Sequence, residues 1–274
     1  MQYRTMKRTG DKLSVIGFGC MRFPEKNRKI DKPRATRQVY SAIDQGINYL
    51  DTAFPYHIGQ SEPFLGEIID KSLRKKVKLA TKLPITSIRT SKDMDKILDA
   101  QLSRLRTDRI DYYMLHGIER ESWNKFLQFD VFEFLERAKS DGRIINIGFS
   151  FHGDNETFTE IVEYYDWHFC QIQYNYLDED IQAGKKGLKL AHQKGLGVIV
   201  MEPLRGGTLT GNIPPQVESI WNQSDVKRTP AEWAFRWVLN HPEVDIVLSG
   251  MNEEHHIDEN IKIAVRNNSK LTKI

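Results

Sequence analysis

The sequence predicts a single α/β barrel of eight strand-helix units, a (β/α)8 or TIM barrel. Eight short runs of β-branched and apolar residues alternate with longer segments of helical period, the pattern of parallel strands joined by helices. No low-complexity linker divides the chain, so residues 1–274 are expected to form one barrel domain. The first run continues as Gly17-Phe18-Gly19-Cys20, which lacks the glycine fingerprint of a doubly wound dinucleotide-binding sheet.

The strand-like runs, each short and apolar enough for a buried parallel strand, are at residues 14–18, 47–50, 77–81, 110–115, 144–148, 168–172, 197–200 and 244–248. Helices are expected between them at 36–45, 61–73, 92–105, 128–140, 155–164, 181–194, 229–240 and 253–264. Several of these begin at Ser, Asp or Thr. Gly46, Gly142 and Gly195 stand one or two residues before the next strand, where the glycine that ends a helix belongs.

Charge and composition exclude several classes of protein. The 40 Lys and Arg against 37 Asp and Glu leave a net charge of +3, which excludes a polycationic nucleic-acid-binding arm. No run approaches the roughly 20 apolar residues of a membrane span, and the polar start lacks the features of a secretory signal. A cytoplasmic protein without a nucleic-acid or membrane partner is therefore expected. Cys20 and Cys170 are too far apart for a CxxC metal motif and are expected to be small buried residues.

Reactive side chains follow the second to fifth strands. In a barrel, residues after the strands meet at the rim where the strands end. Asp51 and Tyr56 follow the second strand, Lys82 ends the third and His116 ends the fourth. Taken singly, these four have ordinary structural explanations as a helix cap, a loop aromatic, a solvated strand end and a buried histidine. Their spacing of about one strand-helix unit predicts that they converge.

Such a cluster suits the acid half of a carbonyl reduction. A nearby Lys82 ammonium would lower the pKa of the Tyr56 phenol, and Asp51 would hold the ammonium in place. The phenol could then donate a proton to a carbonyl oxygen that His116 orients. The hydride must come from a cofactor, because no side chain supplies one.

Six segments, taken in order, carry a resemblance to a known family. They are Ser14-Val15-Ile16-Gly17-Phe18-Gly19, Asp51-Thr52-Ala53-Phe54-Pro55-Tyr56, Ala80-Thr81-Lys82, Asp108-Arg109-Ile110-Asp111-Tyr112-Tyr113-Met114-Leu115-His116, Ile147-Gly148-Phe149-Ser150 and Glu259-Asn260. Along nearly its whole length the chain resembles the aldo-keto reductases. The resemblance implies reversible reduction of a small aldehyde or ketone to an alcohol, with Asp51, Tyr56, Lys82 and His116 as the catalytic tetrad and Tyr56 as the general acid. It also implies a nicotinamide cofactor across the barrel mouth.

The resemblance further implies residues that bind the cofactor. Ser150 and Gln171 match the residues that hold the carboxamide, with Gln173 as the alternative to Gln171, and Met201 stands where most members place an aromatic ring against the nicotinamide. The loop from Leu204 to Leu209 would cross the pyrophosphate. The remaining implied cofactor residues are Leu204, Gly206, Ser249, Gly250, Met251, Asn252, His256, Glu259 and Asn260.

The family favours NADP(H) over NAD(H) as the cofactor, and NAD(H) stays open. Members that favour NADP usually have a Lys or Arg pair after the eighth strand, where this chain has Gly250 and His256. The start of the last helix, near Asn252, could still hold phosphate oxygens through free N–H groups. Alternatively, His255 and His256 belong to a solvated helix face.

A subgroup is also indicated. Residues 21–24, 148–153, 201–207 and 248–251 resemble microbial members that often carry a C-terminal ferredoxin-like extension with clustered cysteines. That extension would begin where the sequence ends, at Ile274, and is absent from this chain; either the protein lacks it or the sequence is a piece of a longer one. The two distant cysteines predict no iron–sulfur cluster in the residues given.

Three other functions are alternatives to carbonyl reduction. Lys82 could be the nucleophile of a Schiff-base aldolase. A metal-dependent hydrolase would need clustered histidines, but His57, His116, His152 and His168 are scattered, and no metal site is expected. A non-catalytic barrel that binds a nicotinamide nucleotide as a redox sensor or regulatory subunit is the third. Residues 119–129 and 211–228 are the segments expected to shape the substrate pocket, and His152 could point into it.

Overall fold

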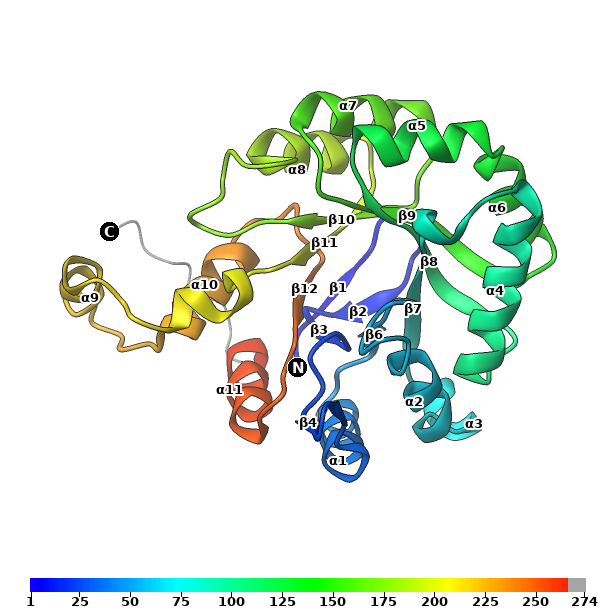
Figure 1. The fold of residues 1–274 in the computed structure, drawn as a ribbon. Helices are drawn as coiled ribbons and strands as arrows, with labels where there is room; N and C mark the ends of the chain where they lie inside the picture. The colour runs from blue at the N-terminus through cyan, green and yellow to red at the C-terminus, as the bar shows by residue number, and fades with distance from the viewer. Residues whose placement is uncertain (266–274) are drawn as a thin grey trace.

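A closed barrel of eight parallel strands lies at the centre of the computed structural model, which describes residues 1–265 (Figure 1). In chain order the barrel strands are β3 (Ile16–Gly19), β6 (Tyr49–Asp51), β7 (Lys78–Leu83), β8 (Ile110–Ile118), β9 (Ile144–Phe151), β10 (Phe169–Gln173), β11 (Gly197–Met201) and β12 (Ile246–Ser249). Each pairs with the next, and β12 pairs with β3 to close the ring. The predicted fold class and all eight strand positions are confirmed.

The helices surround the barrel (Figure 1). They are α1 (Lys32–Asp44), α2 (Ser61–Ile68), α3 (Lys71–Arg74), α4 (Ser91–Leu105), α5 (Arg120–Gln128), α6 (Val131–Ser140), α7 (Asn155–Tyr164), α8 (Gly184–Gln193), α9 (Pro215–Trp221), α10 (Pro230–Leu239) and α11 (Glu254–Val265), with 3-10 turns η1 (Ile85–Ser87) and η2 (Arg205–Thr210). Every predicted helical segment contains a helix. Gly46, Gly142 and Gly195 follow helix ends with φ of +101°, +83° and +79°, the left-handed conformation expected there.

Two differences from the expected helices have local causes. The segment 61–73 is two helices, because the Asp70 carboxylate accepts hydrogen bonds from the N–H groups of Ser72 and Leu73 and so begins α3. The segments 119–129 and 211–228, expected to shape the substrate pocket, contain the helices α5 and α9, which were not among the expected helices. At the start of α5 the side chains of Glu119 and Ser122 form a reciprocal capping box.

Two short antiparallel hairpins were not predicted. They are β1 (Tyr3–Thr5) with β2 (Lys12–Ser14), and β4 (Glu25–Lys26) with β5 (Lys29–Ile30). The first hairpin closes the lower end of the barrel, since Met6 and Leu13 are buried in the interior cluster. Its Asp11 carboxylate accepts the Tyr112 hydroxyl at 2.8 Å and pairs with Lys78 at 2.7 Å. The barrel is thus plugged at the end where its strands begin.

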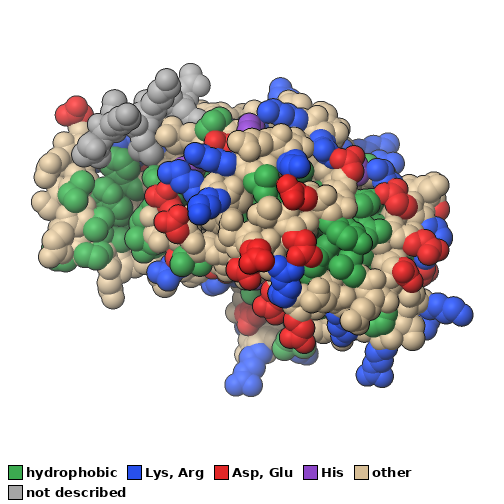
Figure 2. Space-filling model, turned by 90° about the horizontal axis from the view of Figure 1, so that it is seen from above, with side chains coloured by type: hydrophobic (Ala, Val, Ile, Leu, Met, Phe, Trp, Pro, Cys, Tyr) green, Lys and Arg blue, Asp and Glu red, His purple; other side chains and the backbone are tan. Residues whose placement is uncertain are grey.

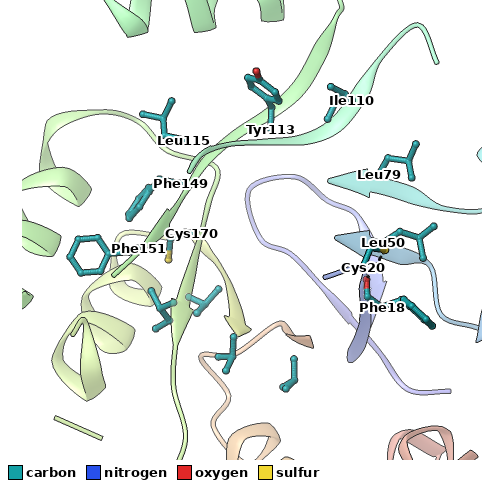
Figure 3. Packing of buried hydrophobic residues seen from close by; sticks show 14 of the residues in the cluster. Phe18, Cys20, Leu50, Leu79, Ile110, Tyr113, Leu115, Phe149, Phe151 and Cys170 are labelled. Carbon is teal, nitrogen blue, oxygen red and sulfur yellow. Dashed lines mark hydrogen bonds between the residues drawn. The ribbon is translucent and has the colours of Figure 1, made fainter. Parts of the chain in front are cut away.

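Side chains of the strands alternate between two apolar layers. The inner layer fills the barrel with Tyr49, Ala80, Tyr112, Met114, Phe169, Ile199, Ile246 and Leu248. The neighbouring residues point outward and pack under the helices, as Figure 3 shows for Leu50, Leu79, Leu115, Phe149 and Cys170. Cys20 and Cys170 are both buried and unpaired with each other, which confirms the expectation that they are small core residues.

The outer surface carries mixed charge. On the face drawn in Figure 2, Lys and Arg side chains are interspersed with Asp and Glu. Within residues 1–265 there is no helix with the length and apolarity that crossing a bilayer demands.

Helices α2 and α4 touch backbone to backbone at Gly66. A Cβ atom built on Gly66 would lie 2.1 Å from the carbonyl oxygen of Arg104, so no other residue fits without moving one helix. This contact holds α2 close to α4, and α2 begins directly after the loop that carries Tyr56.

Substitution of Gly66 tests this contact. In an unconstrained helix Gly→Ala adds ~0.5–1 kcal/mol of stability. At Gly66 we expect the opposite sign, a loss of about 1–3 kcal/mol, because the added methyl group forces the helices apart. Chemical denaturation of Gly66→Ala measures the change in the free energy of unfolding. Ser103→Ala, on the exposed side of α4, is the near-neutral control. A variant as stable as the unmodified protein would contradict the close approach.

Candidate active site

Strand alternation aims three polar side chains into the barrel mouth. Tyr49, Ala80 and Met114 belong to the inner apolar layer, and two residues further along the same strands stand Asp51, Lys82 and His116. A two-residue step returns a side chain to the same face, so these three lie above the apolar filling at the ends of β6, β7 and β8. Tyr56 joins them from the loop after β6. The structure therefore brings the four predicted catalytic residues together.

Lys82 is the centre of this cluster. Its Nζ atom donates hydrogen bonds to Asp51 Oδ1 at 2.7 Å, to the Thr52 carbonyl oxygen at 2.8 Å and to Tyr56 Oη at 3.3 Å. An ammonium has three N–H donors, and each has an acceptor here. The Lys82 side chain is 1% exposed, so no water competes for these donors. The lysine holds the strand end and the Tyr56 loop in one arrangement.

Lys82 and Asp51 form a buried ion pair. Burial alone would lower the pKa of Lys82, but the Asp51 carboxylate and the Tyr56 oxygen outweigh it and raise the pKa above its ordinary value. Burial raises the pKa of the Asp51 carboxyl, while Lys82 and the Gln171 amide act in the opposite direction. Lys82 therefore stays protonated at neutral pH.

The direction of the Tyr56 shift corrects the sequence-based expectation. Burial raises the pKa of Tyr56 and outweighs Lys82, which acts to lower it as expected, while Asp51 raises it further. The sequence predicted the effect of the ammonium but not the depth at which the phenol lies. In this structure Tyr56 is a protonated phenol at neutral pH, which is the state that can donate a proton.

His116 faces Tyr56 across the mouth. The two ring centroids are 6.3 Å apart and the rings meet edge to face. Burial, Lys82 and His152 lower the pKa of His116 to about 3, so the imidazole is neutral at physiological pH. A neutral imidazole beside a phenol offers one N–H donor without a competing positive charge. His152 itself is exposed, on the loop after β9.

A buried polar network behind Lys82 was missed by sequence reasoning. The side-chain amide of Gln101 donates to Glu62 Oε1 at 2.8 Å, to Thr81 Oγ1 at 3.2 Å and to the Lys82 carbonyl oxygen at 3.0 Å, and its oxygen accepts the Tyr113 hydroxyl. Gln101 and Glu62 are fully buried. They come from α4 and α2, so no local motif reveals them; only the helical period, which puts Gln101 on the apolar face of α4, gave a signal.

The loop after Tyr56 is tied to the loop after β3. His57 Nε2 accepts the Phe23 N–H at 3.0 Å, and Nδ1 lies 3.0 Å from Glu25 Oε1. His57 and Ile58 have φ of +52° and +55°, a strained conformation for a non-glycine pair. His57 thus has a structural contact of its own. Among residues 1–265, no three His, Cys, Asp or Glu side chains lie close enough to hold a metal ion.

Ser150 and Gln171 are register neighbours on β9 and β10 and point into the mouth. Ser150 Oγ accepts the Gly117 N–H at 2.7 Å. Gln171 is 1% exposed, and its Oε1 atom has no hydrogen-bond partner among the described residues. Gln173, the alternative, is engaged with Asp178 and Gln182. An unpartnered buried amide oxygen is costly unless a ligand supplies a donor.

The loops after β11 and β12 line the same rim. Met201 ends β11 pointing inward, and Leu204 packs on the core. Gly206 and Gly207 have φ of +68° and +99°, and a Cβ atom on Gly207 would meet nothing within 4 Å. The backbone of this turn therefore has open space beside Gly207.

The residues predicted after β12 fall into two groups. Ser249 and Asn260 hydrogen-bond each other at 2.9 Å and are buried, and Met251 is a buried core residue, so its side chain does not face the mouth. Gly250, Asn252, His256 and Glu259 are partly exposed. Glu259 accepts a hydrogen bond from Thr229 and lines a cavity of about 470 Å³ between α10 and α11.

Comparisons with known proteins identify the family and the fold. The model of the aldo/keto reductase family matches residues 15–272. The chain is 26% identical to the NADH-specific methylglyoxal reductase of Escherichia coli (strain K12) over 94% of this chain and 89% of that protein. It is 27% identical to the 6-dehydroglucose reductase of Novosphingobium aromaticivorans over 94% and 88% of the two chains. In fold it is similar to the holo form of aldo-keto reductase AKR11C1 from Bacillus halodurans, with a TM-score of 0.82 at 24% identity, over 97% and 92% of the two chains.

The low pKa of His116 predicts a pH-dependent stability. Between its ordinary value of 6.5 and about 3 the unfolded chain binds a proton at this residue and the folded chain does not. The free energy of unfolding therefore decreases as the pH falls through this window. Because the ring is partly exposed, we expect His116→Gln to remove about 1–2 kcal/mol of the loss between pH 6.5 and 4.5.

Denaturation at several pH values measures this slope. The unmodified protein, measured at the same pH values, gives the reference slope. If His116→Gln keeps that slope, His116 is not the neutral buried group described above.

Proposed function

This chain belongs to the aldo/keto reductase family, and we propose that Tyr56 delivers the proton of its reaction, with Lys82, Asp51 and His116 arranged around it. The protein is an oxidoreductase that reduces a small-molecule carbonyl with a nicotinamide cofactor. The observation that carries the assignment of Tyr56 is the set of hydrogen bonds from Lys82, because it determines the direction in which the phenol can donate.

Lys82 donates a hydrogen bond to the Tyr56 oxygen. Since all three of its N–H groups are used as donors, the Tyr56 O–H cannot point at Lys82 and is left to donate toward the mouth. When bound, the nicotinamide cofactor supplies a hydride to the carbonyl carbon. Tyr56 gives its proton to the carbonyl oxygen, and Lys82 stabilises the resulting phenolate. In the reverse direction the phenolate removes the proton of the alcohol.

His116 orients the carbonyl. Its imidazole is neutral and lies at the edge of the Tyr56 ring, so one N–H can donate to the same carbonyl oxygen without itself releasing a proton. The proton then comes from the phenol, and the histidine fixes which face of the carbonyl is presented.

The contacts of Lys82 disfavour the function of a Schiff-base aldolase. Such an enzyme needs a neutral, nucleophilic amine, which usually requires a lowered pKa. The pKa of Lys82 is raised and its three N–H groups are bound, so its nitrogen has no lone pair to offer. A sensor without catalysis would not require an intact proton donor with this support.

The residues at the mouth fit a nicotinamide cofactor. The unpartnered Gln171 oxygen suits the N–H₂ of a carboxamide, and Ser150 stands beside it on β9. Met201 and Leu204 offer apolar contact next to them, and the open turn at Gly206 and Gly207 admits a phosphate chain close to the backbone. Glu259, Asn260 and Ser249 then belong to the far end of the cofactor, near α11.

We propose that the protein prefers NADH to NADPH. This differs from the sequence-based expectation of NADP(H), which followed from the cofactor preference of the family. Gly250 provides no side chain, and burial lowers the pKa of His256, so that histidine is neutral at physiological pH. Glu253 and Glu254 stand at the start of α11 and hold Arg34 in ion pairs. A 2′-phosphate there would meet these carboxylates, and Arg34, the cation beside them, is already paired with both. The relative from Escherichia coli is named as NADH-specific.

The remaining features are proposals of the same kind. Residues 119–129 and 211–228, which contain α5 and α9, would shape the substrate pocket, because both follow barrel strands at the mouth. We propose a cytoplasmic location. Methylglyoxal and a 6-dehydroglucose, the compounds named for two relatives, are the first carbonyls to test.

Removal of the Tyr56 hydroxyl tests the proton donor. We expect Tyr56→Phe to lower kcat for carbonyl reduction by about 10²–10⁴-fold, the usual contribution of a positioned acid, and to leave the Kd for the reduced cofactor within twofold. Steady-state kinetics and nicotinamide fluorescence measure the two. Tyr164→Phe, at an exposed tyrosine on α7, is the matched control. Retained turnover in Tyr56→Phe would remove Tyr56 from the mechanism.

Cofactor titration tests the preference. We expect NADH to bind about tenfold or more tightly than NADPH, a difference of ~1.4 kcal/mol, because Gly250 and the neutral His256 provide no cation for the extra phosphate. His256→Arg should tighten NADPH selectively, since it adds a permanent charge at that place. Tighter binding of NADPH to the unmodified protein would refute the preference but not the reductase assignment.

A further inference from the structure

Arg22 lies across the part of the mouth where the loops after β11 and β12 meet. Its side chain runs over Gly250, where a Cβ atom would lie 3.1 Å from both Cβ and Cδ of Arg22. Its Nη2 atom reaches the other loop, 3.5 Å from the place of a Cβ atom on Gly206. Arg22 follows β3, so it comes from a third loop. One side chain therefore spans the gap between the two loops.

The Arg22 guanidinium carries an uncompensated charge. Within residues 1–265 it makes no hydrogen bond and no ion pair, and the residue is exposed. Nearby arginines differ: Arg34 pairs with Glu253 and Glu254, and Arg205 lies 3.4 Å from Asp178. An arginine offers five N–H donors in a fixed plane that match phosphate oxygens. Arg22 is thus ready to bind an anion at the mouth.

Gly250 makes this position available. A Cβ atom at 250 would make a tight contact with the stem of Arg22, which would have to move by a few tenths of an ångström. The glycine after β12 thus gives the arginine after β3 room for its present position. The backbone at Gly206, on the opposite side, has a φ of +68° and no side chain. The guanidinium therefore faces bare backbone, with no carboxylate beside it.

The path of the cofactor leads past this residue. This step rests on the proposed function, in which the nicotinamide lies at Ser150 and Gln171 and the adenosine end lies at α11. The link between the two ends is a diphosphate, which must then pass between the loops after β11 and β12. We propose that Arg22 binds the diphosphate of the nicotinamide dinucleotide.

The proposal distinguishes two phosphates. The diphosphate is common to NADH and NADPH, whereas the 2′-phosphate belongs to NADPH alone. Because the guanidinium reaches toward Gly206 and not toward α11, loss of its charge should weaken both nucleotides by the same factor.

Affinity of the full chain for NADH and NADPH, followed by nicotinamide fluorescence at two salt concentrations, tests this. We expect Arg22→Gln to raise both Kd values about ten- to hundredfold, the range of a charge-assisted hydrogen bond, and to reduce the salt dependence of binding. Arg28→Gln removes the same charge from the exposed turn between β4 and β5 and should leave both Kd values unchanged. Thermal unfolding verifies that the variants are folded.

A second variant acts on Arg22 without changing it. Gly250→Ala adds a methyl group 3.1 Å from the Arg22 stem and should shift that stem by a few tenths of an ångström, so both Kd values should rise, but by less than in Arg22→Gln. In the double variant the effect should be no larger than that of Arg22→Gln alone, since both changes remove one contact.

Each outcome has a distinct meaning. Unchanged Kd values in Arg22→Gln, with tight binding to the unmodified protein, would overturn the proposal and leave the reductase assignment intact. A loss for NADPH alone would also overturn it, because Arg22 would then bind the 2′-phosphate. If the unmodified protein binds neither nucleotide, the cofactor assignment itself fails.

Discussion

The two-residue alternation of side chains in a closed barrel is the constraint on which this structure depends. Alternate residues of every strand must face the interior, because the inside of an eight-stranded barrel is just wide enough to be filled by side chains. In β6, β7 and β8 the interior set runs from Tyr49, Ala80 and Met114 to Asp51, Lys82 and His116. A shift of one residue in any strand would place its polar residue under the helices. The apolar filling thus fixes the polar layer above it.

A buried charge in that layer links stability to chemistry. Lys82 is almost completely enclosed, and breaking such a pair by removing one partner costs about 3–5 kcal/mol in typical proteins. The same three hydrogen bonds that compensate its burial hold Asp51, the backbone at Thr52 and the Tyr56 hydroxyl. Behind it, Gln101 and Glu62 fix the carbonyl side of residue 82. Tyr56, the proposed proton donor, is therefore held by the same contacts that compensate the burial of Lys82.

The parts that could be predicted from the sequence are those with a local period. Strand runs, helical segments and the reactive residues at strand ends follow from alternation, and so the convergence of Asp51, Lys82 and His116 could be predicted. The network of Gln101 with Glu62 could not, because it joins residues far apart in the chain. The direction of the Tyr56 shift depends on burial, which only packing determines. The place of Arg22 at the mouth could also have been predicted. It follows the first strand, and residues that follow the barrel strands meet at the rim.

The closure of the ring has a consequence for how the chain folds. Strand β3, near the start, pairs with β12, near the end, and the N–H of Gln2 bonds the Ala264 carbonyl oxygen in α11. The contacts that complete the barrel thus join the two ends of the described chain and have the largest sequence separations in it. Folding of such a topology is slow. The entropy cost of closing a long loop arises before the contacts between its ends form and compensate it. During synthesis the first strands wait with open edges until residues near 250 have left the ribosome, and this nascent half is the state most exposed to aggregation.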